Sequence, residues 1–205
     1  MIVIVDYGMG NLGSVSNMVS KIGYKSITSS DEKVISSATK LILPGVGSFD
    51  NGITKLKELN LFNILNYKVL EEKTPILGIC LGMQLMTNSS EEGELEGFGW
   101  IDAETKKFNF DNSKRIKVPH MGWNFLRIQQ KNSLFDSISN ESKFYFVHSF
   151  YVTCNNKNDV YATTNYEFEF TSMFKKDNIV ATQFHPEKSH KHGKNLLKFF
   201  LDNVT

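Results

Sequence analysis

The 205-residue sequence lacks the features that mark disulfide-rich, membrane-spanning or strongly charged proteins. Its two cysteines provide no disulfide framework, which fits a reducing compartment. Its 23 Lys and Arg residues nearly balance its 22 Asp and Glu residues, so charge gives no reason to expect binding to nucleic acid or to a membrane. No apolar run is long enough to cross a bilayer. The strand-like run Ile2–Val5 has no basic segment before it and no cleavage site, so we expect no signal peptide. We therefore expect a cytoplasmic protein.

Internal repeats and low-complexity linkers are also missing, and the length suits one domain with a sizeable core. In the first half, apolar strand-like runs alternate with helical patterns; strands are predicted at 2–5, 25–28, 41–43 and 75–79, and helices at 12–22 and from a cap at Asp50 to residue 70. Residues 97–179 are more β-like, and 193–201 read as a closing helix. This alternation predicts an α/β fold with a mostly parallel central sheet, helices on both faces and a mixed or antiparallel extension.

Cys80 ends the apolar run at 75–79 and precedes a helix-compatible run, with Gly78 and Gly82 on either side. This is the pattern of a strand–nucleophile–helix turn with sulfur as the nucleophile. Such a turn exposes the thiol at the carboxyl end of a strand, and the helix N-terminus favours the thiolate. It also makes the backbone N–H of Leu81 a donor to a developing oxyanion. The alternative is a small buried hydrophobic residue, which is also how we interpret Cys154.

A nucleophilic thiol needs a base, and the sequence offers one near its C-terminus. His185 and Glu187 are two residues apart, so in an extended chain they point to the same side. Pro186 between them fixes φ and is expected to keep the segment from becoming helical. Glu187 can then orient one imidazole nitrogen while the other faces the thiol, as in a catalytic triad. The alternative is a strand-end histidine beside a solvated carboxylate.

These two segments, GICLGMQ at 78–84 and QFHPEK at 183–188, resemble the class I (triad) glutamine amidotransferases. The segments DYGMGNL at 6–12, LPGVGSF at 43–49, PHMGWN at 119–124 and FVHS at 146–149 resemble the branch that forms the glutaminase subunits of imidazole glycerol phosphate synthases. The similarity spans almost the whole chain and implies one glutamine amidotransferase domain over residues 1–205. It implies hydrolysis of L-glutamine to glutamate and ammonia, without a cofactor or metal. It also implies a heterodimer with a cyclase subunit of (β/α)8-barrel fold that uses the ammonia to make imidazole glycerol phosphate in histidine biosynthesis.

Gln84 lies one helical turn after Cys80, so it can face the same pocket and hold the α-substituents of glutamine. The resemblance implies that Glu92 lies near the amino group of the substrate and that His148 and Ser149 lie beside its carboxylate. By sequence alone, Glu92 belongs to an acidic stretch at 89–94 that is typical of a solvated loop.

Gly45, Val46 and Gly47 follow a predicted strand and are the candidate second half of the oxyanion hole. Glycines on both sides of Val46 permit a peptide flip that would aim an N–H at the reacting carbonyl, together with that of Leu81. We hypothesise that this flip gates activity. The alternative is an ordinary turn.

Three further residues are candidates for a partner interface. The resemblance places Asn11 on the surface facing the synthase partner and uses the segment that contains Met121 and Trp123 near that partner. Met and Trp are favoured interface anchors, and we expect these two in a loop.

Two weaker patterns are typical of other functions, namely dinucleotide binding and metal binding. Residues 8–13 match G-x-G-x-x-G, but the acidic residue expected about 20 positions on is missing, which favours a tight structural turn over a dinucleotide site. His190 and His192 lie two residues apart before a helix, which is poor zinc geometry without further ligands, so we expect no metal site.

Two departures from the branch pattern leave its partner open. Phe150 stands where a tyrosine is usual, and residues 167–173 are bulkier than the small-residue pattern. One alternative is a paralogous glutaminase that feeds ammonia to a sugar-modifying amidotransferase. Others are a binding or regulatory module without catalysis, and a cysteine hydrolase of peptides or esters.

Overall fold

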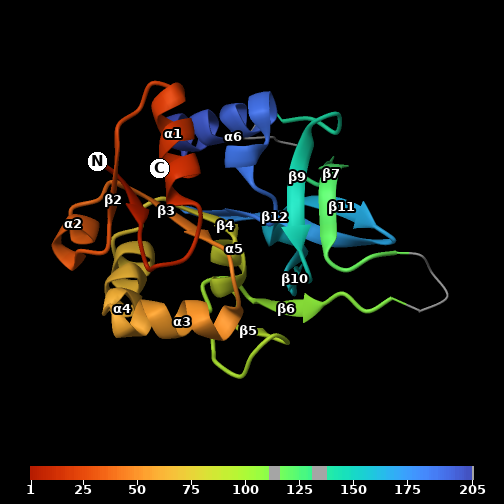
Figure 1. The fold of residues 1–205 in the computed structure, drawn as a ribbon, viewed down its shortest axis with the longest axis horizontal. Coiled ribbons are helices and arrows are strands. Elements are labelled where there is room, and N and C mark those ends of the chain that lie inside the picture. The colour runs from red at the N-terminus through yellow and green to blue at the C-terminus, as the bar shows by residue number, and fades with distance from the viewer. Residues whose placement is uncertain (111–115, 131–137, 205) are drawn as a thin grey trace.

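The computed structural model describes residues 1–110, 116–130 and 138–204, and its centre is a mixed sheet of eleven strands among these residues (Figure 1). One half is parallel, with strand order β2-β1-β3-β4-β13. Its strands are β1 (Ile2–Val5), β2 (Ser26–Ser29), β3 (Lys40–Gly45), β4 (Ile76–Cys80) and β13 (Ile179–Thr182). The first four agree with the predicted strands to within two residues at each end.

The other half of the sheet is mostly antiparallel, as the β-like pattern of residues 97–179 predicts. Strand β12 pairs with β13, β10 and β11, and β6 pairs with β10. The strands are β5 (Ser89–Ser90), β6 (Ala103–Lys107), β8 (Arg127–Ile128), β10 (Phe150–Cys154), β11 (Val160–Tyr166) and β12 (Phe168–Lys176). A separate antiparallel ribbon consists of β7 (His120–Phe125) and β9 (Lys143–His148).

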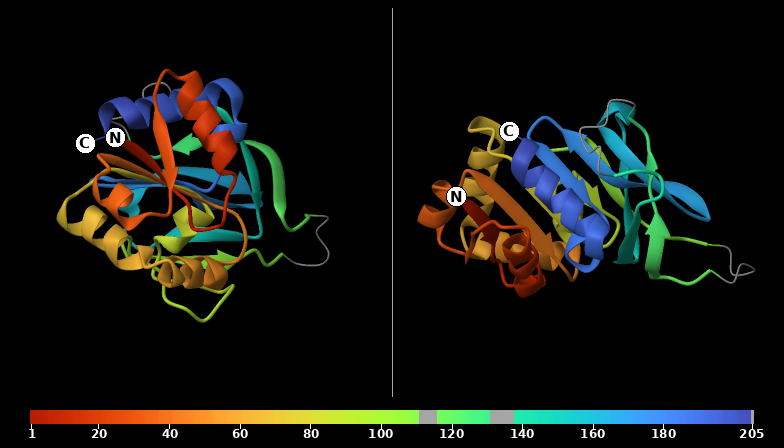
Figure 2. Two further views of the ribbon diagram at one scale, coloured as in Figure 1. Left: turned by 60° about the vertical axis from the view of Figure 1, so that its left-hand side comes forward. Right: turned by 90° about the horizontal axis from the view of Figure 1, so that it is seen from above.

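Helices cover both faces of the parallel half (Figure 2). Because successive strand residues point to opposite faces, β1 sends Ile2 and Ile4 to one apolar cluster and Val3 and Val5 to the other. The first cluster includes α1 (Leu12–Lys21) and α6 (His190–Asn203), and the second includes α2 (Glu32–Ser36), α3 (Phe49–Glu58), α4 (Leu61–Asn66), a π-helical turn (Tyr67–Glu71) and α5 (Leu81–Leu85). Short 3₁₀ turns occur at Lys157–Asp159 and Pro186–Lys188. The predicted fold class is therefore confirmed.

The single helix expected from Asp50 to residue 70 is wrong in two respects. First, the chain breaks at Asn60, whose φ of 58° interrupts the helical path between α3 and α4. Second, Asp50 does not cap the helix, because its carboxylate accepts the backbone N–H groups of Glu94 and Leu95 at 2.9 and 3.1 Å. The first N–H of α3, that of Phe49, is instead bonded to a carboxylate distant in sequence.

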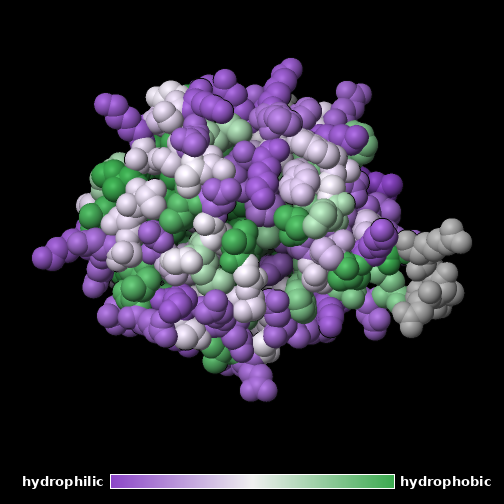
Figure 3. All heavy atoms as spheres, viewed as in Figure 1, coloured by the Kyte–Doolittle hydropathy of each residue, from purple (hydrophilic) through white to green (hydrophobic). Residues whose placement is uncertain are grey.

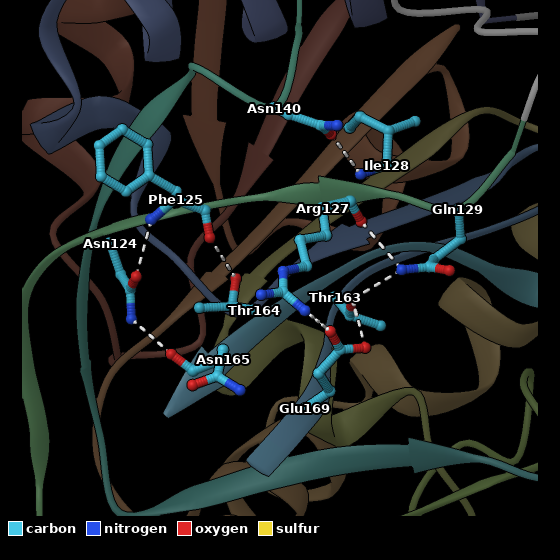
Figure 4. A network of polar contacts seen from close by, with 10 residues as sticks. All are labelled: Asn124, Phe125, Arg127, Ile128, Gln129, Asn140, Thr163, Thr164, Asn165 and Glu169. Carbon is cyan, nitrogen blue, oxygen red and sulfur yellow. Dashed lines mark hydrogen bonds and ion pairs between the residues drawn. The ribbon is translucent and has the colours of Figure 1, made fainter. Parts of the chain in front are cut away.

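Polar side chains attach the chain around β7 and β8 to the antiparallel half of the sheet (Figure 4). The Asn124 amide donates to the Asn165 carbonyl at 3.0 Å, and the Thr164 hydroxyl donates to the Phe125 carbonyl at 3.1 Å. Farther along, Arg127 forms an ion pair with Glu169, and Gln129 donates to Thr163 at 2.8 Å. Glu169 belongs to the bulky segment noted in the sequence, which thus contributes to this attachment.

The surface mixes polar and apolar groups without a dominant patch on the face shown in Figure 3. No described helix is both long and apolar enough to span a membrane.

Candidate functional site

Cys80 is the last residue of β4 and directly precedes α5, in the strand–nucleophile–helix turn that the sequence predicts. Its φ of 54° and ψ of −106° are strained for a residue with a side chain. The turn also brings backbone segments into close approach: a Cβ added to Gly82 would lie 1.8 Å from the Leu43 carbonyl oxygen. The glycine is therefore required for this turn, which holds the sulfur at the carboxyl end of the sheet.

His185 follows β13, the parallel neighbour of β4, so the sheet brings its ring beside Cys80. Nδ1 of His185 lies 2.7 Å from Oε1 of Glu187, and both side chains are almost completely buried. The expectation that Pro186 keeps this segment extended is wrong, because Pro186 begins a 3₁₀ turn. Proline is tolerated at the start of a helical turn, since its missing N–H would have no partner there anyway.

The environment of His185 favours its charged form. Burial alone would lower the pKa of the imidazole, but Cys80 and Glu187 outweigh it and raise the pKa to about 10. Nε2 of His185 is buried and makes no well-formed hydrogen bond to any described residue. The Cys80 sulfur, which helps to raise this pKa, therefore lies near Nε2 without a well-aligned hydrogen bond to it. Nε2 is therefore available to exchange a proton with the thiol or with a bound substrate.

Strand β9 holds His185 in place through its backbone. The His185 N–H donates to the Tyr145 carbonyl at 2.9 Å. The Ser189 hydroxyl donates to the His185 carbonyl at 2.6 Å and accepts the Tyr145 N–H at 3.0 Å. The small β7–β9 ribbon is thus part of the support for the candidate base, not only an appendage of the sheet.

A cavity of about 410 Å³ opens over Cys80, a size suited to a small ligand. All predicted substrate contacts line it, namely Gln84, Glu92, His148 and Ser149. The Gln84 amide nitrogen donates to the Phe150 carbonyl and to Oε1 of Gln183, both at 3.2 Å. Both of its N–H groups are then used, so Gln84 can offer a ligand only its oxygen, as an acceptor.

The side chain of Glu92 is held at the N-terminus of α3. Its Oε2 accepts the N–H of Phe49, the first residue of α3, at 2.8 Å. This contact takes the place of a side-chain cap, because Ser48 provides none. An acidic group at the cavity wall suits a substrate ammonium group.

His148 lies in the cavity wall, but its ring has no free nitrogen. Nδ1 lies 2.7 Å from the Phe150 carbonyl and must donate to it, so Nε2 is an acceptor. Nε2 lies 2.9 Å from Nδ1 of His120, which must therefore be the donor. Nε2 of His120 is then left to accept from the Asn124 amide at 3.3 Å. His148 thus fixes the backbone that follows it and does not present its ring to a ligand.

Both histidines of this pair stay neutral under ordinary conditions. Burial lowers the pKa of His120 to about 4 and that of His148 to about 3. The sequence gives no sign of this role of His120, because the pattern of the segment around it predicts a loop. The segment is strand β7, which places His120 opposite His148 on β9. Only the register of the two strands reveals this contact.

The candidate oxyanion segment lies directly beside the nucleophile. Gly45 is paired in register with Cys80, while Val46 is 45% exposed and Gly47 has a φ of 122°. Leu81 begins α5, where the first N–H groups have no partner within the helix. The predicted residues are thus brought together, and Gly47 has the positive φ that glycine adopts most readily.

Tyr7 is a further residue of this region that sequence reasoning missed. Its hydroxyl is buried without a hydrogen-bond partner among the described residues, and a Cβ on Gly45 would lie 2.2 Å from it. Burial, followed by the nearby Cys80, raises the pKa of Tyr7. Tyr7 therefore stays neutral and fills the space under the oxyanion segment.

The predicted interface residues are exposed. Strand β7 alternates, so that Met121 is 63%, Trp123 43% and Phe125 49% exposed. The loop expected for this segment is therefore wrong, and the apolar side chains form one row on a strand. Asn11 is also exposed and caps α1 by accepting the Ser14 N–H at 3.1 Å.

The weak patterns have structural explanations. Gly8 and Gly10 adopt φ values of 79° and 114° in the turn between β1 and α1. His190 begins α6, and its ring stacks on Trp123 at 5.4 Å. No group of three or more His, Cys, Asp or Glu side chains among the described residues is arranged to hold a metal ion.

Comparisons with known proteins find similarity over nearly the whole chain. The family model described as glutamine amidotransferase class-I matches residues 3–204. The chain is 59% identical to imidazole glycerol phosphate synthase subunit HisH 2 of Methanococcus maripaludis, with 98% of each chain covered. It is 43% identical to HisH 2 of Pseudomonas aeruginosa, with 100% of each covered.

Solved structures show the same fold at low identity. A crystal structure of a glutamine amidotransferase matches with a TM-score of 0.72 and 15% identity, covering 98% of both chains. Another glutamine amidotransferase, from Thermotoga maritima, matches with a TM-score of 0.64 and 17% identity, covering 99% of this chain and 83% of the other.

Proposed function

Because this chain belongs to the class-I glutamine amidotransferase family, we propose that Cys80, His185 and Glu187 form the triad with which it hydrolyses L-glutamine to glutamate and ammonia. The observation that carries the proposal is the buried contact of 2.7 Å between His185 and Glu187, beside a cysteine on the neighbouring strand end. Cys80 lines the cavity, and the buried pair His185–Glu187, more than 100 residues later in the sequence, lies beside it.

The reaction begins when Nε2 of His185 takes the proton of the Cys80 thiol. The sulfur attacks the carboxamide carbon of glutamine, a C–S bond forms, and the carbonyl electrons move to oxygen. The N–H groups of Leu81 and the Gly45–Gly47 segment stabilise this oxyanion once the segment is aligned. His185 then donates its proton to the departing nitrogen, the C–N bond breaks, and ammonia leaves a glutamyl thioester on Cys80.

The second half returns the enzyme to its starting state. His185 takes a proton from water, the hydroxide oxygen attacks the thioester carbon, and glutamate leaves as the sulfur regains a proton. Glu187 orients the imidazole throughout and favours its charged form. Gln84 would accept from the substrate amino group through its oxygen, Glu92 would pair with the same group, and Ser149 would bind the carboxylate.

The relatives named as synthase subunits suggest where the ammonia goes. We propose that the chain is the glutaminase subunit of an imidazole glycerol phosphate synthase in the cytoplasm and forms a heterodimer with a cyclase subunit of (β/α)8-barrel fold. Ammonia protonates readily in water, so a partner seated over the cavity would pass it on unprotonated. The exposed row of Met121, Trp123 and Phe125 and the exposed Asn11 are the proposed contacts.

The test is to measure glutamate release by the purified chain, first alone and then mixed with a candidate cyclase and the ligand of that cyclase. We expect the cyclase and its ligand together to stimulate hydrolysis. Stimulation only by a sugar-modifying amidotransferase would instead support the paralogous function. This second function is tested because Phe150 and residues 167–173 depart from the pattern of the synthase branch. No hydrolysis of glutamine with either partner would contradict the proposed reaction.

A further inference from the structure

Gln183 is buried against the reacting sulfur and has no role in the reaction steps proposed for Cys80, His185 and Glu187. It directly follows β13, and its side chain has no exposed surface. Its backbone N–H donates to the Ser172 carbonyl at 2.9 Å, which fixes the residue in the sheet. Its side-chain amide lies between Gln84 and Cys80. A fully buried amide in this position needs a partner for each of its polar atoms.

The neighbouring hydrogen bonds decide which way the Gln183 amide points. Gln84 donates from its nitrogen to the Phe150 carbonyl, which can only accept, so the nitrogen of Gln84 is fixed on that side. The same nitrogen lies 3.2 Å from Gln183, which must present its oxygen there. The Gln183 nitrogen consequently faces the Cys80 sulfur, at 3.8 Å. The opposite orientation would set two donors against each other.

We propose that Gln183 is a further catalytic residue, whose side-chain N–H donates to the sulfur of Cys80 and stabilises the thiolate before it attacks. The proposal rests on the proposed function in one respect: Cys80 must be the nucleophile. When its proton moves to His185, the negative sulfur becomes a stronger acceptor for this N–H. When the C–S bond forms, the charge passes to the carbonyl oxygen and the contact with Gln183 weakens. Gln183 thus assists ionisation, while the oxyanion donors assist the attack.

The same amide also joins the sulfur to the cavity wall. Gln183 orients Gln84, and Gln84 shares the Phe150 carbonyl with His148. A substitution at Gln183 therefore has two predicted effects of different size. Loss of the Gln183 donor lowers the reactivity of the Cys80 thiol. The Gln84 amide also loses a partner, which we expect to weaken substrate binding by a smaller factor. Alkylation of Cys80 in the absence of glutamine reports the first effect alone, because no substrate has to bind.

The experiment measures the rate at which iodoacetamide alkylates Cys80 as a function of pH, with peptide mass spectrometry to identify the labelled cysteine. Cys154 interferes little near neutral pH, because burial raises its pKa to about 12. The variants are Gln183→Met, which keeps length without a donor, and Gln183→Glu, which keeps shape and an oxygen for Gln84. The matched control is Thr182→Val, which removes a buried hydrogen bond to the Phe184 carbonyl on the same strand end.

We expect Gln183→Met to alkylate about tenfold more slowly at pH 7 and to reach half-maximal rate at a higher pH, as loss of one hydrogen bond to a charged group predicts. Gln183→Glu should be slowed at least as much, because its carboxylate also repels the thiolate. The control should match the parent chain. With glutamine, kcat should fall more than KM rises. Thermal unfolding of each variant identifies any loss of fold, and Gln183→Glu remains informative if Gln183→Met does not fold. An alkylation profile unchanged in both variants would overturn the proposal. A shifted profile in a chain that hydrolyses no glutamine would contradict the proposed function but leave the contact with Gln183 intact.

Discussion

At the scale of single residues, the position of the Cys80 sulfur depends on two glycines, Gly78 and Gly82, which have no side chain. Cys80 adopts a backbone conformation that is unfavourable for any residue with a Cβ, and close packing holds it there. A Cβ on Gly78 would lie 2.8 Å from the Met86 methyl group, and one on Gly82 would lie far closer to backbone. A flexible methionine can move, whereas a strand carbonyl cannot. Gly82 is therefore the stricter requirement.

We expect Gly82→Ala to destabilise the protein by roughly 3 kcal/mol or more, because the added carbon overpacks against the Leu43 carbonyl. The measurement is the midpoint of urea unfolding. Gly13→Ala is the control, since Gly13 lies in α1 with nothing within 4 Å of an added Cβ. That variant should be neutral or stabilised by up to about 1 kcal/mol. Equal stability of the two variants would contradict this account of the turn.

A second residue-scale prediction concerns Glu187, whose carboxylate helps to raise the pKa of His185. Glu187→Gln keeps the shape but removes the charge that favours the imidazolium. We expect kcat for glutamine hydrolysis to fall roughly 10²-fold or more, with a much smaller change in KM. An unchanged kcat would show that Glu187 does not assist the base.

At the scale of elements, the sequence predicted the parts whose signals are local. The alternation of strands and helices, the turn at Cys80 and the pair His185–Glu187 all depend on neighbouring residues, and the structure has them. Strand β7 was missed because its glycine and alternating large residues read as a loop. The pairing of His120 with His148 depends on the register of two strands, and the contact of Gln183 with Cys80 depends on the order of the sheet. Such contacts leave no local pattern.

Strand β7 has two different faces, and the outer one is open to a test. Met121 and Trp123 are exposed outward, while His120 is buried inward. We expect Met121→Asp and Trp123→Ala to weaken binding of the cyclase subunit by about tenfold or more, as for anchors at the centre of an interface. Binding can be measured by titration calorimetry. Ile27→Asp, at an exposed apolar position of β2, is the control and should bind like the parent. A uniform loss in all three variants would argue against this surface.

At the scale of the whole molecule, two buried neutral histidines make stability depend on pH. Above pH 6.5, the ordinary pKa of histidine, they are neutral both in the folded and in the unfolded chain. Below it, the unfolded chain takes up protons, whereas the folded chain does not until the pKa values of about 4 for His120 and about 3 for His148 are reached. The free energy of unfolding therefore falls as the pH drops below 6.5. His185 acts in the opposite direction, since its raised pKa makes its contribution fully present below pH 6.5 and lost as the pH rises toward about 10.

We expect His120 and His148 each to make the free energy of unfolding about 1 to 2 kcal/mol smaller at pH 5 than at pH 7, an effect that His185 offsets in part. The measurement is urea unfolding at both pH values. His120→Asn removes one titrating group, so this difference between the two pH values should shrink in the variant. If the parent and the variant show the same difference, His120 is not held neutral by burial.

Cys80 is proposed to be a nucleophile that attacks glutamine and is activated by His185. The most direct measurement is covalent labelling by a glutamine-like electrophile, followed by peptide mass spectrometry, with and without competing glutamine. We expect label on Cys80 alone, protection by glutamine but not by simple esters, and labelling slowed roughly 10²-fold or more in His185→Asn. Label distributed over other residues, or labelling of Cys80 that neither glutamine nor the loss of His185 affects, would contradict it.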